Sequence, residues 1–227
     1  MSNDFTLPDR NHCVLLIIDV QRDTTLKNAP LEIEGTLEAV PFIQKLVQAF
    51  RDNQSPIIHV VRLYRQDGSN VDLCRRFIVE NGSQMVAPGG DGSELMTELK
   101  PNYRIQLDSD LLLSGQLQKI GNLEWIMYKP RWGAFYNTPL EKHLRLIDAN
   151  TVVICGCNFP NCPRTTAYEA SERDFKIVYV KDATSANYNR GLSELENIGV
   201  RVMDTIQCIE WLEPKMQNTT ARIDTVE

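Results

Sequence analysis

Short apolar runs alternate with amphipathic segments along the chain. Five runs rich in β-branched residues are short enough to be strands buried on both faces, namely residues 13–18, 57–63, 125–128, 151–155 and 176–180. The apolar residues of 35–50 recur at spacings that fit one face of a helix. Thr138, Pro139 and Glu141 form a capping box, which predicts another helix running to about residue 147.

This alternation of strands and helices is typical of right-handed βαβ units. It predicts a three-layer α/β/α sandwich built on a doubly wound, mostly parallel sheet. We expect residues 1–227 to form a single domain. Residues 62–92 are rich in Gly, Asn, Asp and Arg and lack a steady period, so we expect a lid or a subunit interface there. Residues 216–227 are expected to be a polar tail.

The composition narrows the classes of function. The 42% hydrophobic content of 227 residues is enough for a full core, and the apolar runs are too short to cross a bilayer, so we expect a soluble protein. Six cysteines form no disulfide framework, and the N-terminus lacks the features of a signal peptide, which favours the cytoplasm. A net charge of -6 argues against nucleic acid as a partner, and we expect no membrane partner either.

Two predicted strands end in charged residues. In an open parallel sheet, ligands bind beyond the carboxyl ends of the strands. Asp19 ends the first run, although it would also serve as a turn or cap residue. Lys129 ends the third run, and Pro130 after it favours extended backbone. The loop that follows carries Arg131 and two aromatic residues, Trp132 and Phe135, which either line a pocket or pack against the sheet.

A third strand end carries clustered cysteines. Pro163 suits the first position of a helix, which places Cys162 at its N-cap. Free backbone N–H groups and the positive helix end favour a thiolate there, so we expect a lowered pKa and a reactive thiol at Cys162. Cys155 and Cys157 are more simply explained as packing residues. A zinc site on these cysteines is disfavoured because C-x-C-x4-C lacks paired C-x2-C spacing.

Three motifs in this order resemble the isochorismatase-like cysteine hydrolases. They are IIDVQ with Asp19 and Gln21, KPRWGAFYNTPL beginning at Lys129, and GCNFPNCPRTTA containing Cys162. The resemblance spans about residues 14–183 and includes the late VKDA segment. It implies a catalytic triad of Cys162, Asp19 and Lys129, and a cis peptide between Cys157 and Asn158.

The resemblance also implies a mechanism. Asp19 would take the thiol proton, Cys162 would attack a carbonyl carbon, and the N–H groups of about Asn158 and Cys162 would bind the oxyanion. Lys129 would stabilise the thiolate and hold the carboxylate. A thioester intermediate would follow, so the sequence predicts cleavage of a C–N bond in an amide, carbamoyl or ureido metabolite. Gln21, Arg131, Trp132 and Phe135 are the expected substrate contacts.

Some relatives, the nicotinamidases, hold a metal through an Asp-x-His pair and a further His. Here His12, His59 and His143 are dispersed over different predicted elements, so we expect no metal and no other cofactor. Arginines 62, 65, 75, 76 and 131 weakly indicate a carboxylate-bearing substrate, with Arg131 the preferred contact. Solvation of the long loop or pairing at an interface explains these arginines better.

Other functions stay open at this point. One is a vinyl-ether hydrolase of the isochorismatase type, in which Cys162 would be incidental. Another is a non-catalytic assembly protein on the same scaffold, and the least favoured is a redox role for the C-x-C pair. Because relatives assemble as dimers or tetramers, we also expect a homo-oligomer.

Overall fold

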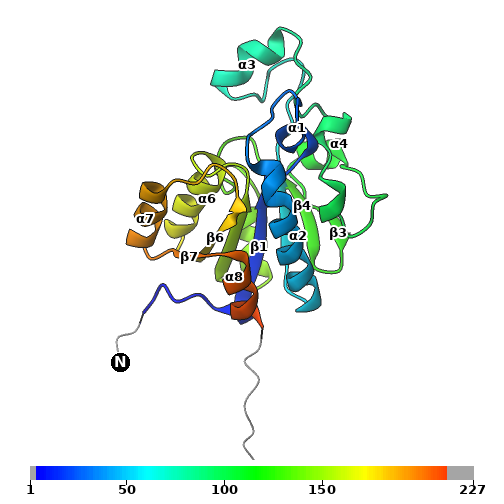
Figure 1. Ribbon diagram of the computed structural model, residues 1–227. Helices are drawn as coiled ribbons and strands as arrows, with labels where there is room; N and C mark the ends of the chain where they lie inside the picture. Colours follow the sequence, from blue (N-terminus) through cyan, green and yellow to red (C-terminus); the bar gives the residue numbers. More distant parts are fainter. Residues whose placement is uncertain (1–3, 214–227) are drawn as a thin grey trace, which may run out of the picture.

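The computed structural model describes residues 4–213, and the tail expected at 216–227 lies outside them. Within these residues, seven strands form one sheet in the order β3-β4-β2-β1-β5-β6-β7, parallel throughout except for β3 against β4. The strands are β1 (Cys13–Ile18), β2 (Ile57–Val61), β3 (Gln118–Gly121), β4 (Glu124–Tyr128), β5 (Thr151–Gly156), β6 (Lys176–Thr184) and β7 (Arg201–Met203). The predicted doubly wound, mostly parallel sheet is confirmed (Figure 1).

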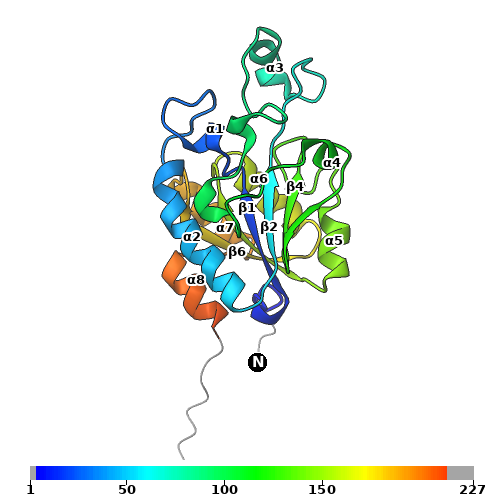
Figure 2. The same cartoon turned by 90° about the vertical axis from the view of Figure 1, so that its right-hand side faces the viewer.

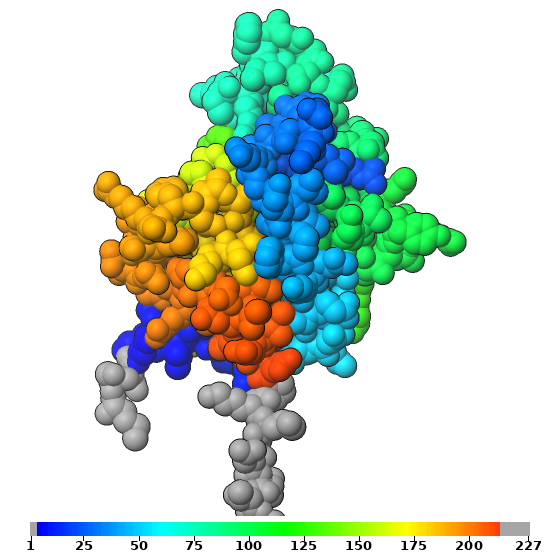
Figure 3. Space-filling model, in the orientation of Figure 1, coloured from blue at the N-terminus to red at the C-terminus, as the bar shows by residue number. Residues whose placement is uncertain are grey.

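Helices cover both faces of the sheet, as Figure 2 shows. The helices α2 and α8 pack on one face, while α5, α6 and α7 pack on the other. Figure 3 shows α2 and α8 side by side on the outside of the molecule. Their bounds are α2 (Thr36–Asp52), α5 (Leu140–Leu146), α6 (Cys162–Ser171), α7 (Asn189–Asn197) and α8 (Thr205–Leu212).

The central strand β1 shows why the strands of the sheet appear in the sequence as continuous apolar runs. Alternate side chains of a strand point to opposite faces. Val14, Leu16 and Ile18 lie in the core under α5, α6 and α7, whereas Leu15 and Ile17 lie in the core under α2 and α8. A strand covered on both sides therefore has no position left for a polar residue.

The two short edge strands β3 and β7 were not predicted. Their exposed positions Lys119 and Arg201 interrupt any apolar run, because an edge strand buries less of its surface than a central one. The prediction for β2 was also two residues too long. Its regular pairing ends at Val61 because the N–H of Arg62 donates to the side-chain oxygen of Gln21 at 2.7 Å.

The capping box predicted at α5 does not form. The N-cap is Pro139 and not Thr138, although the Thr138 hydroxyl accepts a hydrogen bond from the Leu140 N–H at 3.3 Å. The Glu141 carboxylate lies 3.2 Å from Nε of Arg173, which follows α6 in the chain. The helix begins at Leu140 and ends at Leu146, close to the predicted end.

The remaining helices are short. They are α1 (Arg22–Thr25), α3 (Leu73–Glu80), α4 (Ser109–Leu113) and three 3-10 turns at Arg10–His12, Asp91–Ser93 and Thr97–Leu99. No helix within residues 4–213 combines the length and the apolar character needed to cross a membrane.

The segment 62–92 projects from the end of the sheet where the active-site strands finish, with α3 at its tip (Figures 1 and 2). Its base is anchored by a small core that includes Tyr64, Val71 and Val86. The helix α3 was not predicted because its apolar side chains do not follow a buried stripe: Leu73, Phe77 and Ile78 are exposed and only Val79 is buried. The residues that stabilise this segment therefore lie at its base and not along its helix.

Gly156 is required where β5 ends against β1. Its φ of +116° is one that only glycine adopts readily, and an added Cβ would lie 2.3 Å from the Ile18 carbonyl oxygen. We expect Gly156→Ala to lower the free energy of unfolding by about 3 kcal/mol, combining the backbone penalty with the clash. Gly115→Ala is the control, because Gly115 has a φ of +86° and open space around it. Urea unfolding should give a loss of about 1 kcal/mol for the control; equal losses would contradict this account.

Candidate active site

Residues of three central strand ends meet at one narrow cavity. Asp19 follows β1, Arg62 follows β2, and Cys157, Asn158 and Cys162 follow β5, and all five line this cavity. The cavity volume is about 20 Å³, which is room for about one water molecule. It lies where the connections after β1 and after β5 leave on opposite sides, the usual ligand position in an open α/β sheet.

Asp19 is held rigidly by its own backbone. It adopts a left-handed conformation with φ 52°, which aspartate tolerates better than most residues. Its N–H donates to Val60 at 2.8 Å, and its carbonyl accepts from the Thr24 hydroxyl at 2.6 Å. The side chain is buried, and its Oδ1 atom has no hydrogen-bond partner among residues 4–213. That oxygen is therefore available to accept a proton inside the cavity.

Lys129 is fully buried beside Asp19. Its backbone N–H donates to Val61 at 3.0 Å, so it continues the pairing of β4 with β2. The Nζ atom lies 2.8 Å from Asp19 Oδ2 and donates to the Arg131 carbonyl at 3.1 Å. These contacts account for two of the three ammonium protons. The third N–H bond of the ammonium can stabilise a further negative charge nearby.

The turn after β5 carries the backbone groups expected to bind an oxyanion. The peptide bond between Cys157 and Asn158 is cis, at the position that the sequence resemblance implies. The turn is anchored by the Cys157 N–H, which donates to Ile18 at 2.7 Å, and by the Phe159 N–H, which donates to Ser185 at 2.9 Å. Among residues 4–213, the N–H groups of Asn158 and Cys162 donate to no protein acceptor. Both groups are thus free to donate to a ligand.

Cys162 is the first helical residue of α6 and not its N-cap, which is Asn161. Its pKa also differs from the sequence prediction. Burial, followed by the negative charge of Asp19, raises the pKa of the Cys162 thiol to about 11, although Lys129 and Arg62 act in the opposite direction. The expectation of a lowered pKa was wrong because the thiol is only 6% exposed, and the loss of hydration outweighs the positive helix end.

The loop after Lys129 is tied to α6. The Thr166 hydroxyl donates to the Cys162 carbonyl at 2.7 Å and accepts from the Ala134 N–H at 3.1 Å. Glu169 accepts from the Phe135 N–H at 2.8 Å. A Cβ at Gly133 would lie 2.0 Å from the Glu169 carboxylate, so a larger residue there would push this side chain away from the Phe135 N–H. These bonds fix α6, which begins at Cys162, relative to the loop that follows Lys129.

The four expected substrate contacts lie in different places. Trp132 lines the cavity. Phe135 is buried in the core, with its ring centroid 5.6 Å from that of Phe175. Gln21 is fully buried and bridges backbone groups, donating to the carbonyls of Arg62 and Ser93.

Arg131, the arginine preferred from sequence, does not line the cavity. Its guanidinium donates to the carbonyls of Asn70 and Pro130. Arg62 and Arg75 line the cavity instead. Arg62 could have been identified from sequence, because it directly follows a buried strand just as Asp19 and Lys129 do. Arg75 lies on α3 and carries no comparable signal.

The other cysteines and histidines are dispersed. Cys155 is buried within β5, and burial raises the pKa of Cys157, which lines the cavity, to about 12. His59 is buried against Glu124, His12 lies near two exposed aspartates, and His143 packs edge-on against Trp125. No group of three or more His, Cys, Asp or Glu with metal-binding geometry occurs within the described range 4–213.

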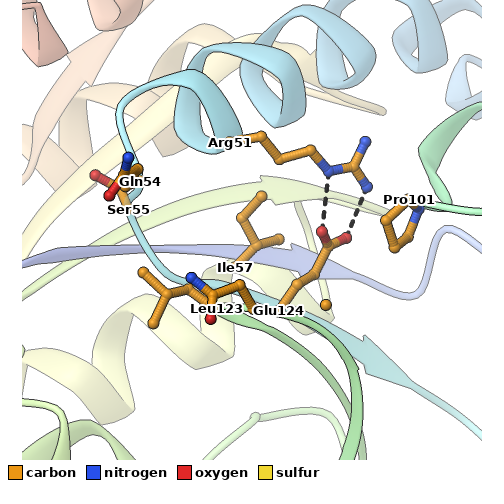
Figure 4. Close-up of a pocket in the computed structure, with 9 residues that line it drawn as sticks. Arg51, Gln54, Ser55, Ile57, Pro101, Leu123 and Glu124 are labelled. Atoms are coloured by element: carbon orange, nitrogen blue, oxygen red, sulfur yellow. Dashed lines mark hydrogen bonds and ion pairs between the residues drawn. The ribbon is translucent and has the colours of Figure 1, made fainter.

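A larger hollow of about 240 Å³ lies at the opposite end of the strands, where β2 and β4 begin, around Arg51, Ile57 and Glu124. Arg51 donates two hydrogen bonds to the Glu124 carboxylate (Figure 4), from Nε at 2.9 Å and from Nη2 at 2.8 Å. The same carboxylate lies 2.7 Å from His59 Nε2. The charged groups of this hollow are therefore paired with one another, and its lining contains no cysteine or lysine.

Comparison with known proteins assigns the chain to a family. The family model for the isochorismatase domain matches residues 13–108 and 115–207. A protein of Arabidopsis thaliana named "probable inactive nicotinamidase" is 29% identical over 207 residues, covering 88% of this chain and 94% of that relative. A ureidoacrylate amidohydrolase of Methylorubrum extorquens is 26% identical over 209 residues, covering 87% of this chain and 78% of that relative.

A solved structure gives the same answer for the fold. The crystal structure of an isochorismatase family protein from Desulfovibrio vulgaris superposes with a TM-score of 0.76 at 28% identity, covering 88% of this chain and 98% of that one. The match of the family model extends over most of the chain and includes every strand of the sheet. The chain therefore belongs to the isochorismatase family of hydrolases.

Proposed function

We propose that this protein is a cysteine hydrolase that needs no metal and cleaves a C–N bond in a small amide, carbamoyl or ureido compound. The observation that carries the proposal is that Cys162 lines the same cavity as Asp19, whose carboxylate forms a buried ion pair with Lys129 behind it. A thiol, a carboxylate with a free oxygen and an ammonium group are the parts that nucleophilic attack on a carbonyl requires. Cys162, Asp19 and Lys129 form the proposed catalytic triad.

The first step is attack by sulfur. The thiol is protonated at neutral pH because its pKa is about 11, so its proton has to leave as the sulfur attacks. Asp19 Oδ1 accepts this proton while Cys162 Sγ bonds to the carbonyl carbon. The carbonyl π electrons move to oxygen, and the N–H groups of Asn158 and Cys162 donate to the resulting oxyanion. Such a donor often contributes about 3 kcal/mol to stabilisation of the transition state.

The second half of the reaction returns the enzyme to its starting state. Protonated Asp19 gives its proton to the departing nitrogen as the C–N bond breaks, which leaves a thioester on Cys162. Water then attacks the thioester carbon, and Asp19 takes a proton from that water. Collapse of the second tetrahedral species releases the carboxyl product, and the proton on Asp19 returns to the sulfur.

Lys129 acts throughout by its charge. It fixes the carboxylate through the 2.8 Å contact to Oδ2, so that Oδ1 is the oxygen that accepts and donates the proton. Its ammonium also lowers the pKa of the Cys162 thiol relative to burial alone, because a positive charge favours the thiolate. Removing the lysine would leave Asp19 buried without a partner, which typically destabilises a protein by about 3–5 kcal/mol.

The named relatives support this reaction class and one alternative. An amidohydrolase acting on ureidoacrylate is among them, and such a reaction breaks a C–N bond. The relative named "probable inactive nicotinamidase" favours a non-catalytic member as the second candidate. Failure of the purified protein on a broad panel of amides, ureides and vinyl ethers would favour that candidate. Hydrolysis of vinyl ethers alone, insensitive to iodoacetamide, would favour a vinyl-ether hydrolase.

We expect Cys162→Ala to reduce turnover of the best amide or ureide substrate by at least about 1,000-fold, because no other group forms the thioester. Cys74→Ser is the control, since Cys74 is exposed on α3. Mass spectrometry during turnover should detect an acyl adduct on Cys162 in the control and none in Cys162→Ala. Full activity of folded Cys162→Ala would exclude the proposed nucleophile.

The raised pKa predicts how the thiol reacts without substrate. The thiolate fraction of Cys162 should grow about tenfold for each pH unit from pH 7 to pH 10, because this range lies below the pKa of about 11. Alkylation by iodoacetamide, followed in the Cys74→Ser background, should rise in the same way. A rate that levels off below pH 8 would mean that the free enzyme holds a preformed thiolate.

We also propose that the protein is a homo-oligomer and that the tip of α3 packs against a second copy. Leu73, Phe77 and Ile78 are 83%, 76% and 48% exposed on this projecting helix, an unusual position for three large apolar side chains. Light scattering coupled to size-exclusion chromatography should show a lower mass for Phe77→Ser than for the parent protein. Ile206→Ser is the control, because Ile206 is 66% exposed on α8 at a distant surface. An unchanged mass for Phe77→Ser, or a monomeric parent, would contradict this interface.

A further inference from the structure

We propose that Arg62 and Arg75, together with the ring of Trp132, form a carboxylate-binding subsite inside the catalytic cavity. The substrate would then be a small acid whose carboxylate lies a few bonds from the C–N bond that is cleaved. This inference rests on the proposed hydrolase function. All three side chains line the cavity that contains Asp19 and Cys162.

The hydrogen bonds of Arg62 leave one edge of its guanidinium unused. The side chain is 2% exposed, and its Nη1 donates to Asp72 Oδ2 at 2.8 Å and to the Pro130 carbonyl at 3.0 Å. Its Nε and Nη2 atoms are buried and have no partner among residues 4–213. A buried donor without a partner is unfavourable, so such groups commonly mark the place of a ligand.

The free edge has the geometry that fits a carboxylate. Nε and Nη2 point their N–H bonds the same way, and this pair forms a bidentate fork with the two oxygens of a carboxylate. Another arginine of this protein binds a carboxylate through the same edge of its guanidinium: Arg51 donates to Glu124 from Nε and Nη2 (Figure 4). Arg62 presents the same fork, with its partner carboxylate missing. A substrate carboxylate would complete it.

The charges around Arg62 favour an anion. Arg62 and Arg75 share a single carboxylate, Asp72, which lies 2.8 Å from Arg62 and 3.9 Å from Arg75. Asp72 also accepts from the Tyr64 hydroxyl at 2.6 Å, and Arg75 donates to the same hydroxyl at 3.0 Å. The cluster of two guanidinium groups and one carboxylate keeps one positive charge. The Asp19–Lys129 pair is neutral as a unit, so this surplus charge is not offset by the catalytic residues.

Trp132 packs against both guanidinium groups. Their central carbons lie 5.2 Å (Arg62) and 4.9 Å (Arg75) from the centroid of its ring, within cation–π range. Arg62 comes from the end of β2, Arg75 from α3 and Trp132 from the loop after β4. The subsite thus joins the segment 62–92 to the catalytic strands. Arg75 is 21% exposed at its side chain, so it can move outward as the narrow cavity admits a substrate.

The experiment compares matched acids and neutral amides. N-carbamoylglycine and N-carbamoyl-β-alanine are each assayed against the corresponding neutral carboxamide, in which the carboxylate is replaced by CONH₂. Only loss of the carbamoyl group is counted, because the added carboxamide has a C–N bond of its own. The parent enzyme should prefer the acid in at least one pair, with a ratio of kcat/KM values of about 10–100, as expected for charge-assisted hydrogen bonds.

Two variants test the residues. Arg75→Gln removes the more exposed cation and should reduce the acid-to-amide ratio of kcat/KM values about tenfold, mainly by raising KM for the acid. Arg62→Lys keeps the charge but lacks the Nε and Nη2 fork, and it should reduce the ratio similarly. Arg65→Gln is the matched control, because Arg65 is exposed on the same segment and does not line the cavity. Thermal unfolding establishes that each variant is folded.

Binding of the same compounds separates the two proposals. Isothermal titration calorimetry on Cys162→Ala should show acids binding more tightly than amides, and this preference should be lost when Arg75→Gln is added. If the acids bind in this way but the parent protein hydrolyses no amide, carbamoyl or ureido compound, the subsite would be supported and the hydrolase refuted. Hydrolysis with equal preference for acid and amide, or an unchanged ratio in Arg75→Gln and Arg62→Lys, would overturn the subsite and leave the hydrolase intact. No binding preference for any acid would also overturn it.

Discussion

The structure depends on one buried ion pair, between Asp19 and Lys129. Both side chains are almost fully withdrawn from water, and burying two charges is costly unless each is held in good geometry. The cost is met by backbone order: Asp19 is fixed by bonds to β2 and α1, and Lys129 continues the pairing of β4 with β2. Because β1, β2 and β4 are neighbours, a small shift of any of them would separate the charges. The pairing of these three strands therefore keeps the two charged groups in contact.

The parts of the fold that depend on burial were predictable from sequence. The central strands and α2 could be recognised because they are covered on both faces or on one stripe, and their apolar spacing reflects that. The edge strands β3 and β7 and the helix α3 were not predicted, because little of their surface is buried and their sequences therefore show no apolar period. The strand ends that carry the candidate site were predictable for a related reason. A charged residue that directly follows an apolar strand, as Asp19 and Lys129 do, is a local signal of a site at the sheet edge.

Properties that depend on surroundings could not be read from the chain. The helix start at Cys162 is visible in sequence, but the burial that raises its pKa comes from side chains distant in the sequence. Arg131 was preferred over Arg62 because it is close to Lys129 along the chain. In space, the guanidinium of Arg131 donates to the carbonyls of Asn70 and Pro130. Arg62 instead lines the cavity with Asp19 and Cys162 and donates to Asp72. Sequence proximity was a weaker guide than position at a strand end.

The arginine cluster and the nucleophile are linked through charge. Arg62 is one of the two cations that lower the pKa of Cys162 against the effect of burial. A substrate carboxylate bound to Arg62 would offset this positive charge and make a free thiolate still less stable. The proton of Cys162 would then leave only as sulfur bonds to carbon, with Asp19 Oδ1 ready to receive it. A cavity of this kind disfavours a preformed thiolate at Cys162. The sulfur would then stay unreactive toward other electrophiles until a substrate brings its carbonyl into place.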